Sequence, residues 1–312
     1  MQKFAIVFPG QGSQKLGMLG EIATEYPQIK STFEEASDEL GIDLWEVTQQ
    51  DSGNILDQTH ITQPVLLVSS IAIWRLWVEK GAPMPALMAG HSLGEYSALV
   101  ASDVIDFRDA VRIVHKRGQL MQQAVENQTG LMAAIVGLEK YQIQEICQKA
   151  AEGQVVSPAN YNSPGQTVIA GNIEAVERAM ELCKEAGARR ALPLNVSVPC
   201  HCDLLQPASA ELAREFQTVE FRQARIPVIQ NLTAELAEKP GEIKESLLDQ
   251  IYKPVQWDDT VKLMASAGVE KVIECGSGKV LCGLIKRSEP GIACFGTDTP
   301  VALDEAIGEV SA

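Results

Sequence analysis

The sequence predicts an α/β protein, with a hydrolase-like core built on a mostly parallel sheet and a small ferredoxin-like domain inserted into it. The first observation is that short apolar runs alternate with helical stretches in both outer parts of the chain, as in a sheet covered by helices on both faces. The second is the order β-α-β-β-α-β between residues 131 and 194, which is the ferredoxin-like motif. We therefore expect a large domain of residues 1–127 and 196–312 and a small domain of residues 128–195.

The first outer part combines buried apolar strands with longer helices. A helix beginning at residue 63 is marked by Thr62 as its N-cap and by Pro64 in its first turn. Hydrophobic periodicity predicts strands at 4–8 and 86–89 and helices at 25–40, 63–80, 97–101 and 106–125.

The rest of the chain contains the small domain and the return to the large one. In the small domain the predicted strands are 131–137, 154–159, 166–170 and 190–194, and the helices are 139–151 and 173–186. After it come strands at 228–230 and 269–274 and helices at 203–215, 242–252, 258–267 and 277–286.

The composition is typical of a globular protein and argues against a membrane, secreted or nucleic-acid-binding protein. Of the 312 residues, 46% are hydrophobic and 21% are charged, as in an ordinary globular protein. We find no apolar run of the ~20 residues that a membrane-spanning helix needs, and the first strand begins too early for a secretory signal. The seven cysteines include no Cys-x-x-Cys, which predicts free thiols in a reducing cytoplasm. The net charge of −15 argues against nucleic acid as a partner.

The stretch Gly90-His91-Ser92-Leu93-Gly94 lies between a predicted strand and a predicted helix. A serine on such a turn, with glycines two residues before and two after, is the nucleophile-elbow pattern. A Cβ at either glycine would clash in so sharp a turn, and Ser92 would stand at the positive end of a helix. Gly-x-Ser-x-Gly strings also arise by chance, but the flanking elements favour Ser92 as a nucleophile.

A serine nucleophile needs a base within hydrogen-bond distance, and the chain has four histidines. His201 ranks first because it follows the small domain, and clefts form at domain junctions. His91 is interpreted as a support of the turn, His60 as a surface residue, and His115 as a packed or solvated residue of an amphipathic helix.

Two other patterns were weighed for metal and phosphate binding. Cys200-His201-Cys202 does not predict a metal site, because three consecutive residues do not converge easily on one ion and no second Cys/His pair has zinc spacing. The loop Gly10-Gln11-Gly12 lacks the remaining residues of a phosphate-binding motif. We expect its backbone near the active site, where the N–H of Gln11 could join that of Leu93 in an oxyanion hole.

Arg117 lies in the middle of a predicted helix, and its role is open on pattern alone. Most arginines at such positions are solvated. Buried beside a nucleophile, Arg117 would instead bind a substrate carboxylate through two parallel hydrogen bonds.

Together these residues resemble the malonyl-CoA:acyl-carrier-protein transacylases of bacterial fatty acid synthesis, over nearly the whole chain. The order and spacing of the shared motifs make the resemblance specific. The motifs are 8–14 (Phe-Pro-Gly-Gln-Gly-Ser-Gln), 62–64 (Thr-Gln-Pro), 90–97 (Gly-His-Ser-Leu-Gly-Glu-Tyr-Ser), 115–118 (His-Lys-Arg-Gly), 160–166 (Asn-Tyr-Asn-Ser-Pro-Gly-Gln), 197–201 (Ser-Val-Pro-Cys-His), 254–257 (Pro-Val-Gln-Trp) and 278–281 (Gly-Lys-Val-Leu).

The resemblance implies a ping-pong transfer in which Ser92 takes malonyl from coenzyme A and a carrier-protein phosphopantetheine thiol then removes it. The residues that it implies are His201 as general acid/base, Gln250 as the residue whose main-chain carbonyl orients His201, Leu93 and Gln11 as oxyanion donors, Arg117 as the carboxylate-binding residue, and His91 and Asn162 beside the substrate. This explains why no carboxylate stands at a triad position. Cys200 stands where a serine is commoner in the family, and Ser277 where a proline is.

The expected partners are malonyl-CoA and a holo acyl carrier protein, with no cofactor of the chain's own, no membrane, and a monomeric state. Carrier proteins are acidic as a class, so a chain of net charge −15 needs a local basic patch to bind one. The candidate docking residues are Arg189, Arg190, Lys286 and Arg287, with Lys184 as a weaker addition.

Three alternatives stay open at this point. A polyketide-type acyltransferase could use another acyl group such as methylmalonyl, although residues 198–201 resemble the fatty-acid enzymes. A serine hydrolase would share the elbow, but Arg117 and the missing triad carboxylate argue against it. A non-catalytic scaffold would leave the set Ser92, His201 and Arg117 without an explanation.

Overall fold

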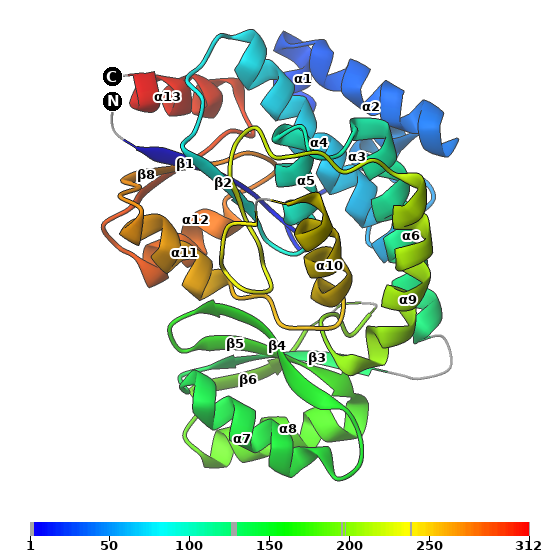
Figure 1. The fold of residues 1–312 in the computed structure, drawn as a ribbon, viewed down its shortest axis with the longest axis vertical. Coiled ribbons are helices and arrows are strands. Elements are labelled where there is room, and N and C mark those ends of the chain that lie inside the picture. The colour runs from blue at the N-terminus through cyan, green and yellow to red at the C-terminus, as the bar shows by residue number, and fades with distance from the viewer. Residues whose placement is uncertain (1–2, 126–129, 195, 197, 238, 312) are drawn as a thin grey trace.

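Two separate sheets organise the molecule (Figure 1). The computed structural model describes residues 3–125, 130–194, 196, 198–237 and 239–311. The larger sheet has five parallel strands in the order β7-β2-β1-β8-β9. The smaller has four strands in the order β4-β5-β3-β6, all antiparallel to their neighbours. The predicted fold class is confirmed.

The central strand β1 is apolar throughout because helices cover both faces of the large sheet. Ile6 and Phe8 enter the core on one face, and Ala5 and Val7 enter a second core on the other. The strands of this sheet are β1 (Phe4–Phe8), β2 (Leu87–Gly90), β7 (Val228–Ile229), β8 (Lys271–Glu274) and β9 (Ala293–Gly296).

The helices of the large domain form two groups along the chain, one that precedes the small domain and one that follows it. Those before it are α1 (Gly20–Glu25), α2 (Gln28–Leu40), α3 (Leu44–Gln49), α4 (Thr59–Glu79), α5 (Leu93–Ala101) and α6 (Phe107–Ala124). Those after it are η1 (Asp203–Leu205), α9 (Gln206–Glu215), η2 (Phe216–Thr218), α10 (Pro240–Gln250), α11 (Trp257–Ser266), α12 (Val280–Ser288) and α13 (Pro300–Ser311).

In the small domain, helices cover one face of the sheet and the other face turns toward the large domain (Figure 1). Its elements are β3 (Gly130–Val136), α7 (Lys140–Ala151), β4 (Val156–Ser163), β5 (Gln166–Asn172), α8 (Ile173–Glu185) and β6 (Arg190–Pro193). Ile135 and Ile169 pack against the two helices, whereas Met132 and Val168 pack on the opposite face with Cys202. The predicted boundary residues 127, 128 and 195 lie outside the described residues, so the domain limits stay a prediction.

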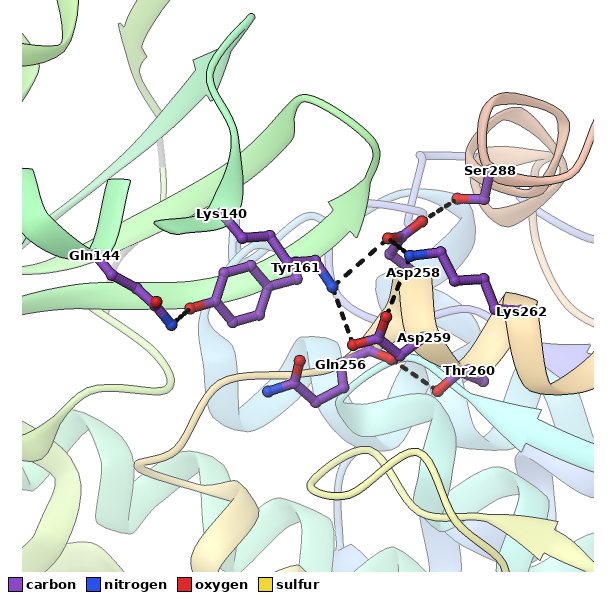
Figure 2. A network of polar contacts seen from close by, with 9 residues as sticks. All are labelled: Lys140, Gln144, Tyr161, Gln256, Asp258, Asp259, Thr260, Lys262 and Ser288. Carbon is purple, nitrogen blue, oxygen red and sulfur yellow. Dashed lines mark hydrogen bonds and ion pairs between the residues drawn. The ribbon is translucent and has the colours of Figure 1, made fainter. Parts of the chain in front are cut away.

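Polar contacts join the two domains along one side (Figure 2). The ammonium group of Lys140 lies 3.0 Å from a carboxylate oxygen of Asp259 and 3.5 Å from one of Asp258. Strand β4 also exchanges backbone hydrogen bonds with the large domain: the N–H of Tyr161 donates to the carbonyl of Val255 at 2.9 Å. These contacts fix the small-domain sheet over the elbow side of the large domain.

Five elements escape the sequence prediction: the helices α1, α3, η2 and α13 and the strand β9. The predicted N-cap Thr62 is also wrong, because α4 begins at Thr59 with Gln58 as its N-cap. Thr62 is buried instead, and its hydroxyl donates to the carbonyl of Leu56 at 2.6 Å. Pro64 therefore lies inside the helix rather than in its first turn.

One further expectation needs correction. Cys282 and Cys294 form a disulfide, whereas the other five cysteines are free thiols as expected. The sequence could not show this pair, because only the packing of α12 beside β9 brings the two residues together. Within the described residues, one helix, α4, is long and apolar enough to cross a membrane by length and composition, but 89% of its most apolar 18-residue window is buried inside the protein.

Candidate active site

The turn at Ser92 is as tight as the glycine pattern predicts. A Cβ on Gly90 would lie 1.9 Å from the carbonyl carbon of Gly94, and one on Gly94 would lie 2.0 Å from the carbonyl oxygen of Phe8 in β1. Ser92 itself has φ 52° and ψ −107°, a conformation that side-chain-bearing residues rarely adopt. The close approach of β1, β2 and α5 thus forces the serine out of the turn.

The side chain of Asn231, in the loop after β7, hydrogen-bonds to the backbone of this strained turn. Its side-chain oxygen accepts a hydrogen bond from the N–H of Ser92 at 2.7 Å, and its side-chain nitrogen donates to the carbonyl of Gly90 at 2.6 Å. One amide side chain therefore satisfies backbone groups on both sides of His91. Such bonds offset part of the strain in the turn.

His201 lies within hydrogen-bond distance of the nucleophile. Its Nε2 is 2.8 Å from Ser92 Oγ, and its Nδ1 is 2.6 Å from the main-chain oxygen of Gln250. A carbonyl can only accept, so Nδ1 carries the proton and Nε2 is left as the acceptor for the serine hydroxyl. Burial, followed by the charge of Arg117, lowers the pKa of His201 to about 3, which keeps the ring neutral at pH 7.

Gln250 can serve His201 because it is the last residue of α10. The final carbonyls of a helix have no acceptor role within it, and the partial negative charge there favours a nearby imidazolium. The side chain of Gln250 has further partners: Nε2 donates to the Ser92 carbonyl at 3.0 Å, and Oε1 accepts from Nη2 of Arg117 at 3.0 Å.

Arg117 is almost completely buried, with 1% of its surface exposed. Nη1 donates to Oε1 of Gln63 at 2.7 Å, and Nε has no hydrogen-bond partner among the described residues. Within that part of the chain no carboxylate lies within 4.0 Å of its guanidinium group. A buried cation whose partners are neutral amides retains its capacity to bind an anion.

The packing of α4 against α6 explains how Arg117 and Gln63 come together. Pro64 has no N–H, so the carbonyl of His60 is left without its helical donor, and Nδ1 of His115 donates to it at 2.7 Å. Gly118 allows the approach, since a Cβ there would lie 2.4 Å from the Cα of His60. His115 therefore has a structural partner on α4 rather than a place beside Ser92.

A cavity of about 200 Å³ lies between the two domains and contains Ser92 and His201. The large domain contributes Gln11 and residues of α12, and the small domain contributes Met132 and Asn162. Nε2 of His91 lies 2.8 Å from Oδ1 of Asn162, so these two residues meet across the domain junction. Leu93 opens α5, where the first N–H groups have no helical acceptor and can face a bound oxyanion.

The acyl transferase domain family matches residues 5–287. The malonyl CoA-acyl carrier protein transacylase of Salmonella typhimurium is 52% identical over 307 residues, which cover 98% of this chain and 99% of that protein. The Bacillus subtilis protein of the same name is 41% identical, covering 98% and 97%. The chain belongs to the malonyl-CoA:acyl-carrier-protein transacylases.

Solved structures of this transacylase family share the whole fold. The Coxiella burnetii transacylase superposes with a TM-score of 0.98 at 44% identity, covering 100% of this chain and 98% of that one. A malonyl-transacylase in complex with the acyl carrier protein of a type II polyketide synthase has a TM-score of 0.97 at 50% identity, covering 99% and 100%.

The predicted docking residues of this family member are only partly brought together. Arg189, Arg190 and Arg287 line one hollow of about 670 Å³, and Nη1 of Arg287 donates to Gln166 at 2.7 Å. Lys286 does not line this hollow. Lys184 is paired with Glu181 on α8.

Sequence reasoning missed three polar residues of the transacylase site: Gln63, Glu95 and Asn231. Glu95 is completely buried, and burial raises its pKa to about 7. Gln63 and Glu95 stand inside two of the motifs that carried the resemblance, which was the available signal. Asn231 lies in a loop with no pattern around it.

Cys202 and His201 have different hydrogen-bond partners. Sγ of Cys202 donates to the carbonyl of Pro199, and His201 is engaged by Ser92 and Gln250. Among the described residues, the group with metal-ligating spacing is Glu274, Cys282 and Cys294, and its two sulfur atoms are bonded to each other.

Proposed function

We propose that the chain moves a malonyl group from malonyl-CoA to the phosphopantetheine thiol of an acyl carrier protein through an ester on Ser92. The observation that carries this proposal is the contact of Ser92 Oγ with His201 Nε2 at the wall of the interdomain cavity. The buried guanidinium of Arg117 is linked to the main-chain carbonyl of Ser92 through the side chain of Gln250. Ser92, His201 and Arg117 supply a nucleophile, a base and a binding group for an acyl anion.

In the first half-reaction, Oγ of Ser92 attacks the thioester carbonyl carbon while Nε2 of His201 takes the hydroxyl proton. The N–H groups of Leu93 and Gln11 bind the oxyanion of the tetrahedral intermediate. When that intermediate collapses, the carbon–sulfur bond breaks and the coenzyme A sulfur takes the proton from His201. The Gln250 carbonyl and the end of α10 stabilise the imidazolium between these two steps.

The second half-reaction runs the same steps with another thiol. His201 Nε2 takes the proton of the pantetheine thiol, whose sulfur attacks the malonyl ester. The Ser92–acyl bond then breaks, and Ser92 recovers its proton from His201. Between the two halves the ester must be protected from water, which suits a small cavity roofed by the small-domain sheet.

The partners follow from this reaction. We propose that the carrier protein docks on the hollow of Arg189, Arg190 and Arg287, with Lys286 beside it, because an acidic protein needs cations there to approach a chain of net charge −15. All the proposed groups come from one chain, which supports a working monomer. The chain needs no cofactor of its own for acyl transfer, and a cytoplasmic location fits the substrates.

Intact-mass measurement tests this function directly. Incubation with malonyl-CoA should add one malonyl group, which a holo carrier protein should then remove, whereas Ser92→Ala should fold normally and gain no mass. Methylmalonyl-CoA and acetyl-CoA in parallel separate the polyketide-type alternative. Covalent labelling of Ser92→Ala, or an ester that water removes as fast as the carrier does, would contradict the proposal.

A further inference from the structure

Glu95 is a buried carboxyl group beneath the nucleophile turn, and the reaction above gives it no task. It lies in the first turn of α5 with 0% of its surface exposed. Its Oε2 accepts from the N–H of Asn231 at 3.1 Å and from Nε2 of Gln250 at 2.8 Å. Its Oε1 has no hydrogen-bond partner among the described residues. A carboxyl group this deep without full hydrogen bonding needs a reason.

Gln250 connects this carboxyl group to Arg117. The Nε2 of its amide faces Glu95 and its Oε1 faces Nη2 of Arg117, so one neutral side chain separates the two charges. No carboxylate oxygen of Glu95 lies within 4.0 Å of a guanidinium nitrogen of Arg117, and both residues bind the amide of Gln250 instead. The site thus contains one buried cation and one buried carboxyl group, whose opposite charges can compensate each other although the two groups are not in contact.

The other ionisable groups around this pair are neutral near pH 7. Burial raises the pKa of Tyr96 on α5 to about 12 and that of the Cys200 thiol to about 11. It lowers the pKa of His91 on the turn and takes that of His201 to about 3. Of the described residues in α10 and the loop after β7, the neutral Gln250 and Asn231 hydrogen-bond to Glu95. Arg117 on α6 is therefore the charge that acts on Glu95.

A malonyl carboxylate on Arg117 would change this balance. Two carboxylates and one guanidinium would then share a buried region, and a net charge away from water is costly. Burial already raises the pKa of Glu95 to about 7, so its protonation at neutral pH costs little. The unpartnered Oε1 is a free position for that proton.

We propose that Glu95 sets the acceptance of anionic acyl groups by charge compensation: at the alkaline pH values at which it is ionised against Arg117 without malonyl, it binds one proton when the malonyl carboxylate pairs with Arg117. The proton comes from solvent, binds a Glu95 oxygen, and returns to solvent when the malonyl group leaves. The inference rests on the proposed pairing of Arg117 with malonyl. Because binding linkage is reciprocal, malonyl should be accepted better at lower pH.

The test compares malonyl with acetyl loading of Ser92 between pH 6 and pH 9. Single-turnover rates from intact mass give a malonyl-to-acetyl ratio in which the titration of Ser92 and His201 cancels. In the unaltered chain this ratio should fall as the pH rises, by up to about tenfold per pH unit for one linked proton. In Glu95→Gln, which copies the protonated form, the ratio should be flat and should exceed that of the unaltered chain at pH 9.

Glu274 provides a matched control. It is also completely buried, its pKa is also raised to about 7, and it caps α12, whose residues line the same cavity. Glu274→Gln should keep the pH dependence of the ratio. If Glu274→Gln also abolishes it, the effect belongs to buried carboxyl groups in general and the inference is overturned.

Two other results would overturn the inference. The first is a malonyl-to-acetyl ratio that does not change with pH in the unaltered chain, a result that needs no variant and so holds even if Glu95→Gln does not fold. The second is a ratio that still falls with rising pH in Glu95→Gln. Arg117→Ala separates this failure from that of the proposed function: an unchanged ratio in that variant removes the carboxylate-binding role of Arg117, whereas a collapsed ratio leaves that role intact.

Discussion

At the scale of single residues, the chemistry depends on two buried side chains. His201 is held neutral beside Ser92 with its lone pair on the side of the nucleophile. The guanidinium group of Arg117 has neutral amides as its partners. One residue therefore accepts a proton and the other accepts an anion, and each can be tested by a single substitution.

His201→Gln should lower malonyl transfer by about two to four powers of ten, the range of general acid–base catalysis. It should also change the pH dependence of folding. In the unfolded chain the imidazole titrates at its ordinary 6.5, while in the folded chain its pKa is about 3. Acid therefore favours the unfolded state below pH 6.5.

Going from pH 8 to pH 5 should cost the unaltered protein about 2 kcal/mol more of unfolding free energy than it costs His201→Gln. Urea denaturation at the two pH values measures the difference. An equal loss in both proteins would contradict the buried, neutral His201, and a comparable loss of transfer in His115→Ala would show that the base is misassigned.

Arg117→Ala should abolish malonyl loading while acetyl loading is kept or increased. Of the two acyl groups, only malonyl carries a carboxylate that loses its partner. Leaving a buried carboxylate unpaired is costly, of the order of 3–5 kcal/mol for a buried pair. Loading rates with malonyl-CoA and acetyl-CoA measure this directly. An equal fall for both acyl groups would assign Arg117 a structural role instead.

At the scale of elements, the site exists because strands and helices approach each other at distances that only glycine allows. β1, β2 and α5 meet at Gly90 and Gly94, and α4 meets α6 at Gly118. The end of α10 then brings Gln250 to the histidine. Two close contacts between elements and one helix end thus bring together side chains that are far apart in the sequence.

Gly94→Ala should prevent the elbow from forming, since its Cβ would lie 2.0 Å from a backbone oxygen of β1 that cannot move aside cheaply. We expect a large loss of thermal stability and no malonyl adduct. The control is Gly308→Ala in α13, where an added Cβ meets no atom within 4 Å. That variant should gain about 0.5–1 kcal/mol from helix propensity. Similar melting temperatures for the two variants would contradict the packing described for the elbow.

At the scale of the whole molecule, the small-domain sheet forms one wall of the cavity and places a basic hollow beside it. The ion pairs of Lys140 with Asp258 and Asp259 hold the two domains together (Figure 2). Backbone hydrogen bonds between β4 and Val255 do so as well. Within the described chain, Arg189, Arg190 and Arg287 have no ion-pair partner. Their charges are therefore available to an acidic protein.

Reversing Arg190 and Arg287 to Glu should raise the KM for holo carrier protein, more at low salt than at high salt, because exposed charges are screened beyond about 10 Å at 0.1 M. Malonyl loading of Ser92 should change much less. Lys30→Glu, an exposed lysine on α2, is the control and should leave the carrier KM unchanged. A carrier KM that ignores both the reversals and the salt would place docking elsewhere.

The sequence alone determined the fold class, the elbow and the order of most elements. These follow from apolar periodicity and from glycine spacing, which are local properties of the chain. It also singled out Ser92 from the elbow pattern and His201 from its place after the small domain, whereas the role of Arg117 came only from the resemblance.

Only the tertiary structure decided how these residues meet. The tautomer of His201, the partners of Arg117 and the support from Asn231 depend on contacts between residues 49 to 141 positions apart. The Cys282–Cys294 bond and the true start of α4 depend likewise on neighbouring elements. Periodicity describes which face of an element is buried, but not what that face is buried against. The raised pKa of Glu95 comes from its burial beneath the turn, opposed by hydrogen bonds from Gln250 and Asn231 and by the charge of Arg117, and none of these neighbours could be read from the pattern.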